Sequence, residues 1–304
     1  FCYEYFLHNE AHSLTSVGVL DTTTSAFSTS GISTGTFKYS GAAAVGTSVY
    51  FAPCNENNVG VYDTTDSTIN TFSTIDISSF STGTFKYSGA AAVGTSVFFA
   101  PLNENNVGVY DTTDSTINTF STIDISSFST GTFKYSGAAA VGTSVFFAPL
   151  NENNVGVYDT TDSTINTFST IDISSFSTGT FKYSGAAAVG TSVFFAPLNE
   201  NNVGVYDTTD STINTFSTID IASFSTGGDK YSGAVAVGTS VFFAPQNEDN
   251  VGVLDTTTST FSTIDTIAAG VTAGQKYSGA AAVGTSVFFA PLNENNVGVL
   301  SSAA

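Results

Sequence analysis

The sequence lacks arginine, tryptophan and methionine, and has only two cysteines and two histidines in 304 residues. Its charge is one-sided, because 25 acidic residues outnumber six lysines and give a formal net charge of −19. Such a chain repels nucleic acid and anionic membrane surfaces, so neither is an expected partner. The hydrophobic fraction of 41% also argues against disorder, because it provides enough apolar surface for a core.

The sequence also lacks an apolar run long enough to cross a bilayer, which argues against a membrane span. Because it contains no initiator methionine, we expect a processed form or a piece of a longer product. Together with the acidity and a predicted disulfide described below, this favours a secreted protein or one in an organelle lumen.

A tandem repeat is the strongest positive signal. The motif Lys-Tyr-Ser-Gly recurs at intervals of 48 residues, with a last interval of 46. Every lysine is a copy of one position, and the six prolines are copies of another. The lysines are Lys38, Lys86, Lys134, Lys182, Lys230 and Lys276.

Each repeat predicts four short strands and no helix. In the second copy these are residues 87–93, 97–100, 107–110 and 119–125, separated by turn residues and by Pro101. Four strands in about 48 residues are typical of a β-propeller blade, and the small residues of the first strand suit the crowded position at the axis.

The predicted fold is therefore all-β: a six-bladed β-propeller of four-stranded antiparallel blades, with the ring closed by an N-terminal outer strand. We assign residues 1–15 to an N-terminal segment and 16–304 to a single propeller domain. The predicted blades are 38–79, 86–127, 134–175, 182–223, 230–267, and 276–304 completed by 16–30. A linear solenoid would need polar end repeats, whereas the two ends of this chain look complementary.

One count does not match six blades. The third-strand motif Val-Gly-Val occurs seven times, whereas the first-strand motif occurs six times. Either the copy at Val297 or the copy at Val17 takes the third place in the last blade, and the other is displaced, frayed or paired at an outer edge.

The turn between the third and fourth strands resembles that of kelch repeats. Four copies carry a Tyr-Asp pair, as at Tyr110-Asp111, and a phenylalanine such as Phe120 stands where kelch blades usually have tryptophan. The kelch double glycine is replaced here by Ala-Pro. The resemblance implies a propeller but specifies no activity, because kelch-like propellers range from scaffolds to a copper oxidase.

The lysines are the first candidate site. They should share one face with the Asn-Glu loops, as a ring around the axis that could bind an anion or a partner. The alternative is a set of repeated ion pairs with the same-face carboxylates. Those carboxylates are Glu56, Glu104, Glu152, Glu200, Glu248 and Glu294.

An apolar patch is the second candidate. The residue before the lysine is Phe37, Phe85, Phe133 or Phe181 in four copies, but Asp229 and Gln275 in the last two. Further phenylalanines in the same loops could extend this patch or be buried under the loop. They are Phe80, Phe128, Phe176 and Phe224.

Three weaker signals remain. Paired aspartates in the turns, such as Asp111 and Asp114, suggest either calcium ligands or turn caps. His8 and His12 could bind a metal with Glu10, although no metal is specified. Cys54 replaces a residue that is usually leucine in the other copies, which indicates a disulfide with Cys2.

The predicted function is a non-enzymatic binding protein or scaffold that presents repeated loops on one face to a protein partner. An enzyme needs unlike residues in one site, and nucleophilic triads need a histidine within the fold. A multivalent glycan-binding propeller is the alternative. An axial anion or metal site is the second alternative, and no cofactor is expected.

Overall fold

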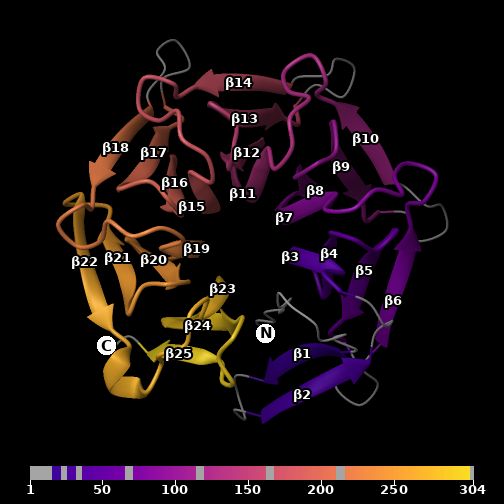
Figure 1. Ribbon diagram of the computed structural model, residues 1–304. Helices are drawn as coiled ribbons and strands as arrows, with labels where there is room; N and C mark the ends of the chain where they lie inside the picture. The colour runs from indigo at the N-terminus through magenta and orange to yellow at the C-terminus, as the bar shows by residue number, and fades with distance from the viewer. Residues whose placement is uncertain are drawn as a thin grey trace.

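The computed structural model describes residues 16–21, 26–31, 36–65, 71–113, 120–161, 168–209 and 216–301. Small antiparallel sheets are arranged in a ring, with the first strand of each blade nearest the axis (Figure 1). The prediction of an all-β, six-bladed propeller is confirmed. Within the described ranges, no helix is long and apolar enough to cross a membrane.

Five blades are four-stranded sheets in which consecutive strands pair. Blade one contains β3 (Tyr39–Val45), β4 (Ser48–Pro53), β5 (Asn58–Asp63) and β6 (Thr71–Asp76). Blade two contains β7 (Tyr87–Val93), β8 (Ser96–Pro101), β9 (Asn106–Asp111) and β10 (Phe120–Asp124). Blade three contains β11 (Tyr135–Val141), β12 (Ser144–Pro149), β13 (Asn154–Asp159) and β14 (Phe168–Asp172).

The remaining blades follow the same plan. Blade four contains β15 (Tyr183–Val189), β16 (Ser192–Pro197), β17 (Asn202–Asp207) and β18 (Phe216–Asp220). Blade five contains β19 (Tyr231–Val237), β20 (Ser240–Pro245), β21 (Asn250–Asp255) and β22 (Thr260–Asp265), followed by the 3-10 helix η1 (Ile267–Ala269). Blade six contains β23 (Tyr277–Val283), β24 (Ser286–Pro291) and β25 (Gly298–Ser301), and a separate sheet contains β1 (Ser16–Asp21) and β2 (Ala26–Gly31).

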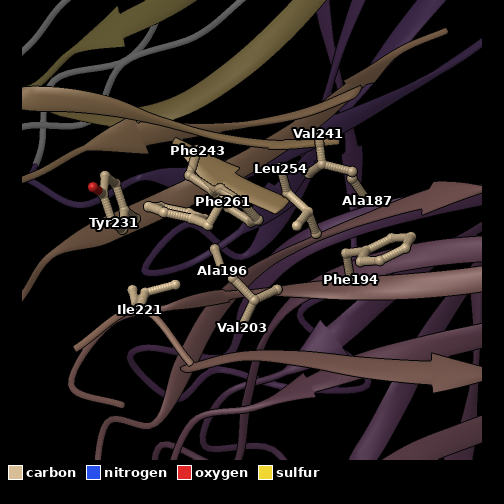
Figure 2. Packing of buried hydrophobic residues seen from close by; sticks show 10 residues of the cluster. All are labelled: Ala187, Phe194, Ala196, Val203, Ile221, Tyr231, Val241, Phe243, Leu254 and Phe261. Atoms are coloured by element: carbon tan, nitrogen blue, oxygen red, sulfur yellow. The ribbon is translucent and has the colours of Figure 1, made fainter. Parts of the chain in front are cut away.

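The core lies between successive blades. The second strand is almost wholly buried, because its valine and phenylalanines face the two neighbouring sheets. Figure 2 shows one such interface, where Phe194 and Ala196 of blade four pack with Val241 and Phe243 of blade five. Burial of this apolar surface, repeated around the ring, is the main stabilising contribution.

The glycine of the Lys-Tyr-Ser-Gly motif allows the inner strands to approach closely. A Cβ placed on Gly137 would lie 2.8 Å from the Cα of Gly185 in the next blade, and one on Gly185 would lie 2.8 Å from the Cα of Gly233. Real Cβ atoms do not approach backbone this closely, so the ring requires glycine here.

The closure of the ring differs in detail from the prediction. The copy at Val297 supplies β25, the third strand of blade six, and residues 16–21 and 26–31 form β1 and β2, which pair with each other. Within the described residues, blade six is a three-stranded sheet and is not completed by residues 16–30. The β1–β2 sheet lies between blade six and blade one (Figure 1). The physical reason is the backbone pairing. β1 pairs with β2 in the same register in which β5 pairs with β6, so β1 and β2 form their own antiparallel pair.

Candidate functional site

The lysines are buried, which corrects the prediction of an exposed positive ring. Lys86, Lys134, Lys182 and Lys230 have no exposed surface, and Lys276 is 2% exposed. The Nζ of Lys134 donates to the main-chain carbonyl of Asn103 in the preceding blade, at 3.0 Å. The same bond recurs from Lys86 to Asn55, Lys182 to Asn151, Lys230 to Asn199 and Lys276 to Asn247. Each of these lysines therefore links two blades rather than facing a ligand.

Burial lowers the pKa of the lysine ammonium groups in blades one to five. Desolvation lowers the pKa of Lys134, and the charges of Glu152 and Glu104 oppose this shift without cancelling it. Only Lys276 forms an ion pair among the described residues, with Asp249 at 3.0 Å. This face therefore does not present six ammonium groups that could bind an anion.

The glutamates instead tie loops together. The Oγ of Ser81, in the loop after blade one, donates to the Oε1 of Glu104 in blade two at 2.5 Å. Equivalent serine–glutamate bonds occur at Glu152, Glu200 and Glu248, and the amide of Ala273 donates to Glu294 at 2.9 Å. These carboxylates hold the entry to the inner strand against the Asn-Glu loop.

The four phenylalanines before the lysines form a continuous aromatic ladder. Ring centroids are 5.5 Å apart for Phe37 and Phe85, 5.9 Å for Phe85 and Phe133, and 5.9 Å for Phe133 and Phe181. These spacings suit attractive aromatic contact. Phe85 and Phe133, in the middle of the ladder, pack on a small leucine cluster, and Phe181 at its end is 39% exposed. Blades one to four therefore share one apolar surface on the loop face.

The backbone under this ladder is unusual. The four phenylalanines have φ between 49° and 53°, and Asp229 and Gln275 in the last two blades have φ of 51° and 53°. Positive φ is rare for bulky side chains and costs on the order of 1–3 kcal/mol. The geometry of the repeat imposes this conformation in every blade, yet the sequence keeps phenylalanine in four of them.

The second group of phenylalanines lies elsewhere. Phe80 is 43% exposed and its ring contacts Phe120 of the outer strand β10, with centroids 5.2 Å apart. Phe128, Phe176 and Phe224 make the same contact with the outer strand of the next blade. Because their ring partners are outer-strand residues, they cover the outer part of each blade and are not linked to the ladder by ring contacts.

The turn aspartates act as caps. Oδ1 of Asp111 accepts a hydrogen bond from the amide of Thr113 at 2.9 Å, and Asp63, Asp159 and Asp207 repeat it. This is the local bond that favours aspartate in turns. Asp114 lies outside the described residues. No group of three or more metal-binding side chains occurs within the described ranges.

The predicted disulfide of Cys54 with Cys2 is not formed. The thiol of Cys54 is free and buried, and desolvation raises its pKa to about 12. Cys54 occupies the place of the leucines in the cluster beneath the ladder, so a small apolar side chain suffices there. Cys2, His8, His12 and Glu10 lie outside the described residues.

Comparisons with known proteins support the fold. No protein-family model and no curated protein matches the chain. Among solved structures, it is similar to a chain in a structure titled "Crystal structure of Nidogen/Laminin Complex", with a TM-score of 0.55 and 12% identity over 83% of this chain and 91% of that one. This likeness concerns the fold alone, so the kelch-like assignment and the secreted location stay predictions.

Proposed function

We propose that the protein is a non-enzymatic binding scaffold that uses the phenylalanine ladder of blades one to four to hold a segment of a protein partner. The observation that carries this proposal is the ladder itself: Phe37, Phe85, Phe133 and Phe181 keep a costly backbone conformation and present contiguous aromatic surface. A bulky aromatic residue kept at positive φ in four successive blades, with part of its ring surface exposed, is typical of a functional surface.

The partner should be apolar and basic rather than acidic. Aromatic side chains on a rigid frame are typical of binding hot spots, because they bury much area at little entropic cost. The net charge of −19 attracts basic segments and repels acidic ones. The structure with the nidogen/laminin title is of a protein complex, which is consistent with a protein-binding use of this fold.

The ladder can be removed without adding backbone strain, because asparagine tolerates positive φ better than phenylalanine. We would select peptides from a displayed library on the protein and measure their affinity for the double variant Phe85→Asn/Phe133→Asn. We expect at least a tenfold loss of affinity with the Tm unchanged within a few degrees.

The matched control places asparagine at the same position of the last two blades, as Asp229→Asn/Gln275→Asn, and should bind as the unmodified protein does. Peptides that bind both variants equally would overturn the proposal. A glycan array on the same proteins tests the lectin alternative: sugar binding that is lost with the ladder would replace the protein partner by a glycan.

A further inference from the structure

Four phenylalanines on the outer part of the ring stay exposed although they lie in ordered loops. Each lies in a loop that leads from the outer strand of one blade to the inner strand of the next. We call them the outer phenylalanines: Phe80, Phe128, Phe176 and Phe224. All four are between 42% and 44% exposed. Because the values agree in four loops, the exposure is a property of the repeat and not of one irregular loop.

The turn that carries each outer phenylalanine is fixed at both ends. In the loop after blade two, the amides of Phe128 and Ser129 donate to the carbonyl of Ile125 at 2.9 and 3.0 Å. Ile125 is fully buried, and the Oγ of Ser129 donates to the carboxylate of Glu152. The backbone at Phe128 is therefore held between two buried anchors, and its ring is presented to solvent by a defined turn.

This turn forms without an aromatic residue as well. In the loop after blade five, Ala269 stands at the equivalent position, and its amide donates to the carbonyl of Thr266 at 3.1 Å. The amide of Phe128 makes the same bond to the carbonyl of Ile125. The hydrogen bonds of the turn therefore do not require phenylalanine, and its presence in the other four loops calls for a further reason.

Exposed hydroxyl groups flank each of these rings in the chain. Ser126 and Ser127 precede Phe128 and Thr130 follows it after one residue, and all three are exposed. The ring of Phe128 meets that of the buried Phe168 at 61°, with centroids 5.2 Å apart. This contact fixes one side of the ring and leaves other ring surface open to solvent. Each loop therefore combines a fixed aromatic surface with several hydroxyl groups.

An exposed aromatic face beside hydroxyl groups suits the face of a sugar ring. The C–H groups of a hexose pack on the aromatic ring, and its hydroxyls exchange hydrogen bonds with polar neighbours, so the ligand needs both apolar surface and a few polar groups. An apolar protein segment fits less well, because binding hot spots lie at the centre of larger patches. Each outer phenylalanine contacts an outer-strand ring, and within the described ranges no ring contact joins one outer phenylalanine to another.

We propose that the outer phenylalanines are four equivalent binding sites for an uncharged polysaccharide, one at each of the first four blade junctions. The net charge of −19 repels acidic glycans and therefore favours neutral ones. A single site of this size binds weakly, but four sites on one rigid ring bind a repeating polymer with avidity. These sites are separate from the ladder and do not depend on its proposed function.

Affinity electrophoresis tests the assignment, with native gels that contain a neutral β-glucan, a mannan or a galactan. At least one of these polysaccharides should retard the unmodified protein. The variant Phe128→Leu/Phe176→Leu keeps apolar packing on the outer strands but removes two aromatic faces, so its affinity should fall at least tenfold. Leucine at all four positions should abolish the retardation, with the Tm unchanged within a few degrees.

Two matched variants serve as controls. Phe128→Tyr/Phe176→Tyr keeps the aromatic faces and should be retarded as the unmodified protein is. The ladder variant Phe85→Asn/Phe133→Asn should also be retarded normally, so a failure of the ladder proposal is distinguishable from a failure of this one. The proposal is overturned if none of the three gels retards the unmodified protein, or if the variant with four leucines is retarded equally. Retardation that is lost in the tyrosine variant or in the ladder variant would overturn it too.

Discussion

The lysine and the residue before it are neighbours in the chain but have opposite environments. Lys134 is fully buried and bonded to the preceding blade, and its counterparts are lysine in every copy. Phe133 beside it lies in the ladder, and its counterparts change to Asp229 and Gln275 while the backbone keeps the same φ. The contrast teaches that the ring fixes the backbone at both positions but requires a particular side chain at only one.

The largest expected effect concerns pH and the tyrosine that follows each lysine. Burial raises the pKa of Tyr87, Tyr135 and Tyr183 well above the ordinary value of 10. The unfolded chain therefore loses these protons first, and the stability present below pH 10 falls as pH rises above it, by roughly 1.4 kcal/mol per pH unit for each tyrosine. Urea denaturation from pH 9 to 11 measures this loss.

The lysines of blades one to five change the stability in the opposite direction over a neighbouring pH range. Because burial lowers the pKa of Lys134 below 10.5, the unfolded chain binds more protons than the folded chain between the lowered value and 10.5, so stability rises with pH there. The fall above pH 10 should nevertheless dominate, since the raised tyrosine pKa values extend well beyond this range. The variant Phe133→Asn should show the same alkaline loss as the unmodified protein, and a different curve would contradict the separation of the two positions.

The next effect in size comes from the lysine itself. Lys134→Ala removes a buried side chain and leaves the carbonyl of Asn103 without its donor, so we expect a loss of about 2–4 kcal/mol in the free energy of unfolding. Lys38→Ala should cost less, because the Nζ of Lys38 has no hydrogen bond to lose. Chemical denaturation of both variants checks the difference, and equal losses would show that side-chain packing, not the bond between blades, sets the cost.

The smallest effect concerns the ion pair of the sixth lysine. Asp249 is 58% exposed, so Asp249→Asn should lower stability by less than about 1 kcal/mol, and the difference should shrink in high salt. Thermal denaturation at two salt concentrations measures it. A larger loss that persists in salt would mean that the carboxylate is needed to compensate the buried ammonium of Lys276.

Much of the fold could be predicted because it depends on repetition. Six copies of the Tyr-Ser-Gly strand and of the proline-terminated second strand identify the blade and its count. The ends of the ring could not be predicted from the pattern, because β1 and β25 carry nearly the same third-strand motif. Sequence alone does not specify which sheet each joins; hydrogen-bond register does.

For the candidate site, too, the sequence predicts some features and only the structure shows the others. The phenylalanine series and its break at Asp229 and Gln275 are visible in the sequence, but its continuous ring contacts and positive φ are not. The lysines were predicted at the face as charges, whereas folding buries them, because a carbonyl from the preceding blade comes within reach only once two copies stand side by side.

The sequence by itself determined the all-β blade, its repetition and its acidic, arginine-free composition, since these follow from local pattern and residue content. Only the tertiary structure decided that the lysines connect blades, that Cys54 is free and that the hydrogen bonding of Lys38 differs from that of the other lysines. The physical reason is that each of these properties belongs to a contact between blades, and near-identical repeats carry no local signal that tells one interface from the next.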